Sequence, residues 1–592
     1  MVPLFTTVLR RIIAIPILSF CLVSCASSIA TCASTPKVIN VTQMGDRYIL
    51  HGDVDLKGRT LSIPKGIFFD CREGVVHNGR VIGNQSKLIY NAPFIGEGVI
   101  IEGCYVDDKE VYSDQILVKN HFSNQDIHNV FNLVKDGATV VFEQGIYKDV
   151  THVCFNKNIT IDFSNSIIET KVDQYGLSSS VFLTDVEPLF RIKNIAIKNV
   201  TIDGKVPKYG IESGIGPRRN AIRIVGAMNV MLDNVEIKNF RFGTSGDYSK
   251  DVKKRHMAGV CSIMNYRKCT IQNCKLSMNT GEGFYLVPEE NDNNYLLFKG
   301  NISTNNYGTF LTLVDGRCLV EDNKMDVFGL SGMNVFCYNS VIRNNHFKSG
   351  ERFNCIDITE NGLYWPRNVV ISGNTADGCE GFIMASGENI TISDNKCMNP
   401  VSAFALTIYG YAETNDQSPG FLVQRGKAGG NVKMRIENNI LQCKGGIATY
   451  PGCKGDLSIL GNTITIIPDD KKTVHRGTAM EFYDCSKLIV SGNTFNDSFR
   501  NSITRANVYI TIKNSTCDAT IRGNKFNRTV SNADASHFLF VEDVKFENII
   551  IEDNNSNVPN INARVVEGKI PVRGKKIVRN NGRIVIKGTS LE

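Results

Sequence analysis

The sequence predicts an all-β solenoid, in which short strands wind into coils that stack along one axis. A unit made of an apolar strand followed by Gly-Asn or Asp-Asn occurs twice between Val369 and Asn395 and recurs along most of the chain. The recurring Asn are usually roughly 20 to 40 residues apart, a period typical of solenoids. The strands before them, such as Ile390-Thr391-Ile392, are too short for helices and rich in β-branched residues.

We expect each of these Asn to make the same tight turn, because Asn enters the left-handed region readily, above all after Gly. Stacked coils would place the amides above one another, where each hydrogen-bonds the next. One coil cannot bury its own apolar face, so neighbouring coils must share a continuous core. The fourteen positions are Asn199, Asn234, Asn273, Asn301, Asn323, Asn345, Asn374, Asn395, Asn439, Asn462, Asn493, Asn524, Asn554 and Asn581.

Length and charge fit one long domain with a polymer as its partner. A chain of 592 residues exceeds one ordinary globular core but suits a stack of coils. The formal charge is +7, and removing a leader that contains Arg10 and Arg11 lowers it to +5. This mild excess fits an acidic polymer, and the lack of a long basic run argues against nucleic acid as a partner.

The N-terminus resembles a bacterial lipoprotein signal. Arg10 and Arg11 precede an apolar run from Ile12 to Val23, and Leu22-Val23-Ser24-Cys25 resembles a lipobox. The run is short for a bilayer span, so we expect cleavage after residue 24, acylation of Cys25 and a tether over 25–36. Ala26 favours an outer-membrane lipoprotein, facing the periplasm or the cell surface. The alternative is an uncleaved membrane anchor.

The remaining cysteines predict core positions. Without Cys21 and Cys25, sixteen of the eighteen Cys remain, with no CxxC pair or metal-like spacing. Cys261, Cys355, Cys379 and Cys397 lie in strands or beside turns, where a small apolar side chain fits a stacked interior. A disulfide framework is the alternative, and no metal site follows from these cysteines.

The order of segments suggests a capped solenoid. Residues 37–105 hold short strands with dense turn signals, and we expect them to form an N-terminal β cap segment, because an open apolar end would aggregate. We expect the β-solenoid itself to span 106–557. Residues 558–592 are expected to form C-terminal coils or a cap. Between Asp126 and Tyr147 the spacing of Ile127, Val130 and Phe131 predicts a short amphipathic helix before a strand over 138–142.

This helix, followed by Gly-Ala-Thr-Val-Val-Phe at 137–142, resembles the start of proteins in the pectate-lyase-like superfamily of right-handed parallel β-helices. The resemblance covers about 126–581 and implies that fold, with carbohydrate polymers as substrates. Polygalacturonase-type hydrolases of this fold carry four signatures, of which only Arg-Ile-Lys occurs here, at 191–193. Their mechanism is therefore not carried over. No Asp/Glu cluster indicates calcium, so no cofactor or metal is identified.

Strand alternation predicts a row of outward side chains before the longest loops. Inward Ile222 and Ile224 place Arg223 outward, and the same reasoning gives Ser262, Tyr285, Thr312, Asp357 and Thr407. The first five are expected on successive coils about 4.8 Å apart, so the row would span roughly 20 Å. That length suits a few sugar units.

The loops beside this row carry candidate substrate-binding residues. Aromatic rings suit stacking on the apolar faces of sugars; the candidates are Tyr364, Trp365, Tyr409 and Tyr411, with Glu413 beside them. For Trp365 the alternative is packing under a loop. The insertion over 242–257 supplies Lys253, Lys254, Arg255 and His256, and with Arg218 and Arg219 it would form a basic patch; the alternative is a solvated charged loop.

Three function classes remain open. A polysaccharide lyase would use Arg223 to neutralise a uronate carboxylate and Tyr285 or His256 as the base for β-elimination. A glycoside hydrolase needs two carboxylates, and Asp357 with Glu282 or Glu413 is the best pair. The third class is a non-catalytic glycan-binding or adhesive protein. We expect a monomer that acts on an acidic polysaccharide by β-elimination, with the other two classes as alternatives.

Overall fold

The computed structural model describes residues 40–587, with internal gaps. The residues it does not describe within this range are 119–121, 152, 155, 171–181, 184–191, 206–219, 241–258, 280–281, 291–292, 307, 329–330, 351–353, 360–364, 399–403, 409–431, 444, 451–452, 468–477, 498–507, 529–536, 557–560, 566–571 and 580–583.

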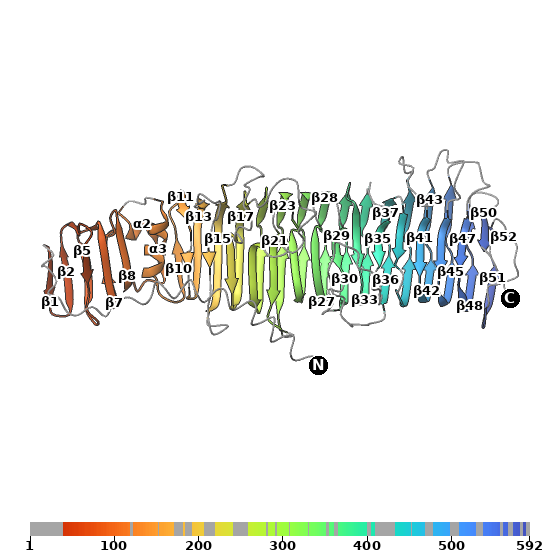
Figure 1. Cartoon of the computed structure of the whole chain (residues 1–592), viewed down its shortest axis with the longest axis horizontal. Helices are drawn as coiled ribbons and strands as arrows, with labels where there is room; N and C mark the ends of the chain where they lie inside the picture. The colour runs from red at the N-terminus through yellow and green to blue at the C-terminus, as the bar shows by residue number, and fades with distance from the viewer. Residues whose placement is uncertain are drawn as a thin grey trace, which may run out of the picture.

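The chain forms a long rod of stacked coils, in which each strand pairs in parallel with the strand one coil further on (Figure 1). Two strand ladders run along the rod, here named sheet 1 and sheet 2. Sheet 1 contains β12 (Val153–Cys154), β14 (Phe182–Leu183), β16 (Ile222–Val225), β18 (Gly259–Tyr266), β21 (Glu282–Pro288), β24 (Leu311–Gly316), β27 (Met333–Arg343), β29 (Asn354–Ile358), β32 (Gly381–Ala385), β35 (Phe404–Ile408), β38 (Gly445–Thr449), β41 (Thr478–Tyr483), β44 (Val508–Lys513), β47 (His537–Glu542), β50 (Ile561–Val565) and β52 (Ile584–Lys587).

Sheet 2 takes the other strands of each coil, and the second half of β27 joins it. Its strands are β9 (Glu110–Tyr112), β10 (Ala138–Val141), β11 (Ile146–Val150), β13 (Ile159–Thr170), β15 (Ile192–Asp203), β17 (Ala227–Lys238), β19 (Lys268–Gln272), β20 (Lys275–Ser277), β22 (Tyr295–Lys299), β23 (Ile302–Asn306), β25 (Cys318–Glu321), β26 (Lys324–Phe328), β28 (His346–Gly350), β30 (Arg367–Ser372), β31 (Thr375–Asp377), β33 (Glu388–Ser393), β34 (Lys396–Met398), β36 (Val432–Glu437), β37 (Ile440–Cys443), β39 (Gly455–Leu460), β40 (Thr463–Ile466), β42 (Cys485–Ser491), β43 (Thr494–Asp497), β45 (Thr516–Arg522), β46 (Lys525–Arg528), β48 (Lys545–Glu552), β49 (Asn555–Ser556) and β51 (Lys576–Arg579).

An N-terminal unit of mostly parallel strands lies at one end of the rod (Figure 1). Its strands are β1 (Val41–Met44), β2 (Arg47–His51), β3 (Val54–Asp55), β4 (Thr60–Ser62), β5 (Phe68–Glu73), β6 (Val76–His77), β7 (Gly79–Ile89) and β8 (Val99–Tyr105). Only the β1–β2 pair is antiparallel.

The predicted amphipathic helix is confirmed as α3 (Asn124–Leu133), which follows the short helix α2 (Ser113–Ile116). The backbone N–H of Asp126 donates to the Ser123 hydroxyl over 3.2 Å, and the backbone N–H of Ser123 donates to the Asp126 carboxylate over 3.0 Å, which makes a capping box. At the other end the Lys157 ammonium donates to the carbonyls of Phe131 and Val134, each over 2.8 Å. Burial lowers the pKa of Lys157. Both ends of α3 are therefore satisfied within the chain.

Alternate residues of each strand fill the interior, as predicted. Ile356, Ile358, Leu286, Met480 and Phe482 are each 0% exposed, whereas Asp357, Tyr285 and Glu481 between them are only partly buried. The four cysteines predicted as core residues, Cys261, Cys355, Cys379 and Cys397, are buried free thiols, which confirms the prediction. The strand register predicted from sequence is therefore correct at these positions.

The Asn column is a continuous hydrogen-bonded ladder. Each amide nitrogen donates to the amide oxygen of the Asn one coil further on, over 2.8–3.0 Å, and almost all of these side chains are completely buried. The prediction that they stack along one edge is confirmed. The ladder runs through Asn301, Asn323, Asn345, Asn374, Asn395, Asn439, Asn462, Asn493, Asn524 and Asn554.

The expected cause of the ladder is wrong in one respect. The positive φ lies on the residue before the ladder Asn, for example Gly373 at 64° and Asp394 at 57°. Asn199, Asn234 and Asn273 have positive φ themselves and so occupy that preceding position, outside the ladder. Gly, Asp or a first Asn, such as Asn344 and Asn438, therefore makes the turn, and the next residue places its amide in the ladder. Asn581 lies outside the described residues.

Candidate functional site

The outward row of sheet 1 is confirmed by the strand register, with two additional coils. Arg223 pairs with Ser262, Ser262 with Tyr285, and Tyr285 with Thr312. Asn334 on β27 then follows Thr312 and precedes Asp357, and Met384 follows Asp357 before Thr407. The expectation that Thr312 and Asp357 lie on successive coils is therefore wrong. Arg223 and Asp357 are five coil steps apart, about 24 Å at the strand spacing of parallel sheets.

Two neighbouring polar atoms of this row have no hydrogen-bond partner in the described part of the chain. Thr312 is 6% exposed and its hydroxyl is buried without a partner, and the amide oxygen of Asn334 on the next strand is in the same state. A buried polar group left without a hydrogen bond costs about 1–3 kcal/mol. Such groups are rare in folded proteins, and a ligand or an ordered water commonly supplies the hydrogen bond.

Asp357, one coil beyond Asn334, is a carboxyl with a perturbed pKa. Burial raises its pKa to about 6, while hydrogen bonds from Thr359 act in the opposite direction. One oxygen, Oδ1, accepts both the backbone N–H of Thr359 over 2.9 Å and its hydroxyl over 2.7 Å. These bonds orient the carboxyl, and Oδ2 is left with no hydrogen bond from a described residue.

Two other predicted catalytic residues, Arg223 and Glu282, lie on earlier coils of sheet 1 than Asp357. Arg223 is on β16, two coil steps or about 10 Å from Tyr285. Glu282 begins β21 and is buried, three coil steps or about 14 Å along the axis from Asp357. A hydrolase pair needs about 5–9.5 Å between carboxyl groups, so the structure does not bring Glu282 and Asp357 together as such a pair.

Tyr285 is one of the two residues that the sequence predicts as the base for β-elimination. Burial, and secondarily the charge of Glu282, raise its pKa above the ordinary value, so the phenol keeps its proton at neutral pH. Ser262 is 6% exposed and accepts a hydrogen bond from the amide of Asn220 over 3.0 Å. Two predicted row residues lie one coil from the buried atoms that lack a partner among the described residues. Tyr285 neighbours Thr312, and Asp357 neighbours Asn334.

Most loop residues of the predicted site fall outside the described residues. These are Tyr364, Tyr409, Tyr411, Glu413, Lys253, Lys254, Arg255, His256, Arg218 and Arg219, and the proposed lipidation site Cys25. Trp365 is described and only partly exposed: its ring packs against the core, and its indole nitrogen is buried without a partner in the part of the chain that is described. The contact of the ring with the core favours packing over a sugar-stacking role for Trp365.

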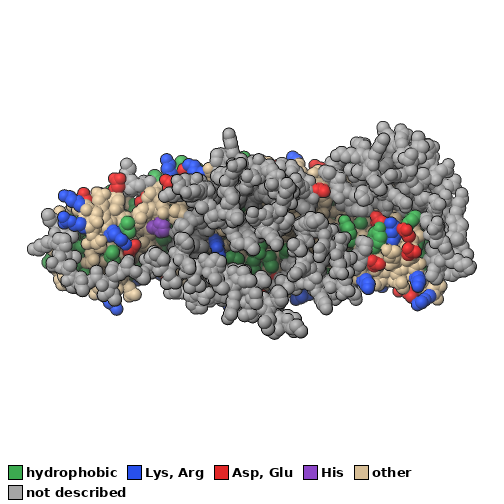
Figure 2. All heavy atoms as spheres, viewed as in Figure 1, with side chains coloured by type: hydrophobic (Ala, Val, Ile, Leu, Met, Phe, Trp, Pro, Cys, Tyr) green, Lys and Arg blue, Asp and Glu red, His purple; other side chains and the backbone are tan. Residues whose placement is uncertain are grey.

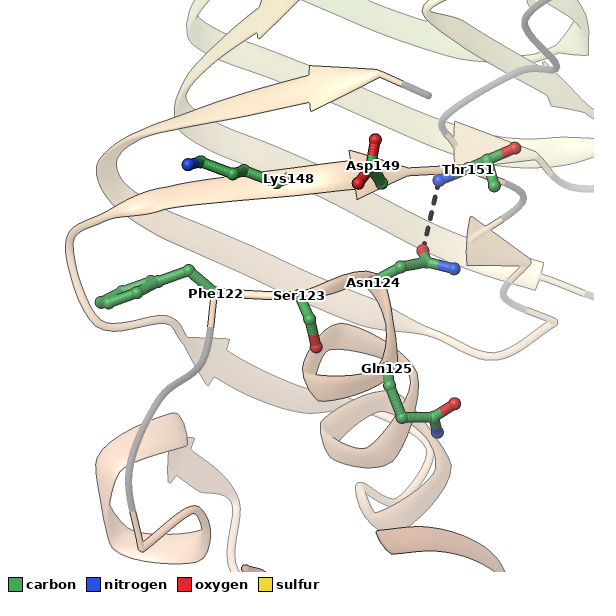
Figure 3. Close-up of a pocket in the computed structure, with 7 residues that line it drawn as sticks. All are labelled: Phe122, Ser123, Asn124, Gln125, Lys148, Asp149 and Thr151. Atoms are coloured by element: carbon green, nitrogen blue, oxygen red, sulfur yellow. Dashed lines mark hydrogen bonds between the residues drawn. The ribbon is translucent and has the colours of Figure 1, made fainter. Parts of the chain in front are cut away.

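A surface pocket of about 380 Å³ lies away from the row, beside the start of α3 (Figure 3). It is lined by residues 122–125 and by Lys148, Asp149 and Thr151. The backbone N–H of Thr151 donates to the Asn124 side chain over 3.2 Å, and Figure 3 shows that the lining side chains point in different directions rather than toward a common point. The pocket therefore offers no converging set of ligand-binding groups.

Two properties of the described residues concern metal ions and membranes. No three His, Cys, Asp or Glu side chains in the described ranges lie close enough together to hold a metal ion. Among the described helices, none has the length and apolar character needed to cross a membrane.

Comparisons with known proteins identify the fold. A family model described as "Right handed beta helix region" matches residues 220–397. No curated protein matches the chain. Similar solved structures include a lacto-N-biosidase from Eubacterium ramulus, with 12% identity, 81% of this chain and 68% of that chain covered and a TM-score of 0.34. A DFA-IIIase from Arthrobacter chlorophenolicus A6 has 12% identity, coverage of 78% and 100%, and a TM-score of 0.27.

The exopolygalacturonase of family 28 from Yersinia enterocolitica is similar at the same level, with 12% identity, coverage of 78% and 76%, and a TM-score of 0.28. Such values are too low to carry an argument about activity. The family model covers the centre of the rod, and parallel coils continue on both sides of it. The chain is thus a right-handed parallel β-helix, the fold implied by its resemblance to the pectate-lyase-like superfamily.

Proposed function

We propose that this protein binds a polysaccharide along the outward row of sheet 1 and that Asp357 protonates a glycosidic oxygen of the bound polymer. The observation that carries the proposal is the set of three consecutive row positions, Thr312, Asn334 and Asp357. Two of them hold buried polar atoms with no partner among the described residues, and the third is a carboxyl whose pKa is about 6. Sugar hydroxyls would supply the missing hydrogen bonds.

The chemistry follows from the protonation state of Asp357. A carboxyl with a pKa near 6 still carries its proton in mildly acidic solution, so it can donate that proton to the leaving oxygen as the glycosidic bond breaks. Water then adds its hydroxyl to the sugar carbon and returns a proton, which makes the reaction a hydrolysis. Glu413, which the sequence predicts as a partner carboxylate, lies outside the described residues.

β-Elimination on an acidic polysaccharide is the second candidate, and Arg223 is the observation that favours it. Arg223 points outward on the same row and has no ion-pair partner in the described part of the chain, so it is available to a uronate carboxylate. The raised pKa of Tyr285 opposes its use as the base near neutral pH. Lipidation at Cys25 and an outer-membrane location remain proposals that fit a polymer-degrading surface protein.

Product analysis tests the proposal. The purified protein is incubated with neutral polysaccharides and with polygalacturonate, and new reducing ends are measured beside the ultraviolet absorbance of unsaturated uronates. Reducing ends without that absorbance support hydrolysis, and both together support elimination. Asp357→Asn should lower the rate by at least about 100-fold. Asp326→Asn, which alters an exposed carboxylate on sheet 2, is the matched control and should leave the rate unchanged.

Two results would contradict the assignment. Parental activity in Asp357→Asn would remove Asp357 from the chemistry. Loss of activity in Arg223→Ala, together with full activity in Asp357→Asn and absorbance from unsaturated products, would favour elimination instead. If no polysaccharide is cleaved but one is bound, the row is a binding surface without catalysis.

A further inference from the structure

A second cluster of charged and aromatic side chains lies on sheet 1 further toward the C-terminus. Tyr483, Lys513 and Glu542 end the consecutive strands β41, β44 and β47 and are in register with one another. Glu481 is two residues before Tyr483 and belongs to the outward row, four coil steps or about 19 Å beyond Asp357. Figure 2 shows basic, acidic and hydrophobic side chains gathered on this part of the surface.

The polar groups of this cluster hold one another in place. The Tyr483 hydroxyl donates to Oε1 of Glu481 over 2.8 Å, and the Lys513 ammonium lies 3.0 Å from the same oxygen. Lys513 also donates to the Tyr483 hydroxyl over 3.3 Å and lies 3.7 Å from the Glu542 carboxylate. The side chains of Glu481 and Lys513 are only 20% and 22% exposed. Binding a ligand would therefore require little further ordering of these side chains.

The cluster also keeps unused hydrogen-bonding groups. Oε2 of Glu481 and the hydroxyl of Thr511, the next residue of the outward row, make no hydrogen bond with another described residue. Burial, and then the bond to Glu481, raise the pKa of Tyr483, so its phenol stays protonated. Fixed acceptors beside a fixed ammonium are suited to sugar hydroxyls, which both donate and accept.

An exposed aromatic ring lies one coil before the cluster. Tyr450 directly follows β38 and is 47% exposed. Its neighbour Thr449 exchanges hydrogen bonds with the backbone of Tyr483, at 2.6 Å to the N–H and 3.3 Å to the carbonyl, which fixes the two coil ends side by side. An exposed ring next to oriented carboxylate and ammonium groups provides an apolar platform for the C–H face of a sugar.

We propose that Tyr450, Glu481, Tyr483, Lys513 and Glu542 form a second carbohydrate-binding site, for a neutral, hydroxyl-rich polysaccharide. Two carboxylates against one ammonium give the cluster a formal charge of −1, which opposes a uronate polymer. The site extends the proposed function, because a polymer lying along the rod would reach it from Asp357. It does not depend on cleavage, so binding here and chemistry at Asp357 can fail separately.

The test is binding of defined polymers to the full chain in the Asp357→Asn background. Galactomannan, xyloglucan and arabinoxylan serve as neutral probes and polygalacturonate as the acidic probe, with retardation in affinity gels as the readout. At least one neutral polymer should retard the protein, and Tyr450→Ala and Glu481→Gln should each weaken that binding about tenfold or more. Glu437→Gln, which breaks an exposed ion pair with Arg435 on sheet 2, is the matched control and should bind normally.

The possible outcomes separate this site from a purely structural ion-pair network. If Glu481→Gln lowers the melting temperature while Tyr450→Ala and Glu481→Gln still bind as the parent does, the cluster only stabilises the rod. Binding of polygalacturonate alone, or of no polymer at all, also overturns the inference. Because Tyr450 is exposed, its substitution tests binding even if the Glu481 variant folds poorly. If the parent protein binds a neutral polymer but cleaves no polysaccharide, the reaction proposed for Asp357 is contradicted, whereas the second binding site is not.

Discussion

The Asn ladder and the outward row of sheet 1 are both columns of side chains stacked at the coil spacing, but they differ in hydrogen bonding. Asn395 donates to Asn439 and to the Ile371 carbonyl, and its amide oxygen accepts two bonds from Asn374. Those four bonds use the full capacity of the amide. Thr312 and Asn334 in the row instead hold buried atoms that no described residue satisfies.

If the proposed function is correct, this difference separates structural from functional polar groups in a fold where both repeat with the same period. In the ladder, burial and full pairing hold the coils in register. In the row, burial of the Thr312 and Asn334 atoms without a hydrogen bond lowers the stability of the fold. The row is therefore the column in which to look for a ligand.

The largest expected effect tests the strand register on which both columns depend. Ile358→Asp places a charge at a completely buried position beside Asp357 and should cost about 5 kcal/mol or more, from lost apolar burial and an unpaired charge. Chemical denaturation measures the free energy of unfolding. Val370→Asp, at a position 38% exposed on sheet 2, is the control and should cost less than about 1 kcal/mol. Equal stability of the two variants would mean that the register is wrong.

Next in size is the ladder itself. Asn395→Ala removes four hydrogen bonds and leaves buried groups of Asn374 and Ile371 without partners, so we expect a loss of about 3–5 kcal/mol. Asn527→Ala removes an exposed bond to Asn496 and should cost less than about 1 kcal/mol. Unfolding curves of the two variants should differ clearly; a small effect at Asn395 would remove the contrast between the columns.

How far the sequence alone reaches can be judged from these same columns. The apolar strands and the Gly-Asn or Asp-Asn steps predict the coils, because burial and turn formation are local requirements. An outward residue between two inward apolar residues also occurs at Asn334, between Met333 and Val335, and at Met384, between Ile383 and Ala385. The sequence therefore contains the signal that places both residues in the row. Including both residues gives the correct number of coils between Arg223 and Thr407.

Other features do not follow from local pattern. Whether Thr312 finds a hydrogen-bond partner depends on groups far away in the sequence, since its neighbours are supplied by other coils. Asp357 was predicted as an outward carboxylate, but its raised pKa comes from burial in the assembled rod. The cluster at Glu481, Tyr483 and Lys513 joins residues of separate coils and carries no sequence motif.

A smaller effect, with a defined dependence on pH, is expected at Asp357. Its pKa rises from the ordinary 3.8 to about 6 on folding, so between these values the folded protein holds a proton that the unfolded chain has lost. The free energy of unfolding should therefore fall as pH rises through 6, by up to about 2–3 kcal/mol. Asp357→Asn should remove this slope, and melting temperatures of both proteins from pH 4 to 8 measure it. Parallel curves would show that Asp357 titrates normally.

The smallest expected change in stability distinguishes the outward row from the Asn ladder most clearly. Removing a polar group from the ladder should lower the stability, whereas removing one from the row should leave it unchanged or raise it. Thr312→Val replaces a buried hydroxyl that lacks a partner by a methyl group of similar shape, so the protein should be unchanged or more stable by about 1 kcal/mol. If the hydroxyl binds substrate, polysaccharide binding should weaken in the same variant. Thr391→Val, on an outward position of sheet 2 far from the row, should alter neither property. A Thr312→Val protein that loses stability and keeps full binding would show that the hydroxyl serves the fold, as the ladder amides do.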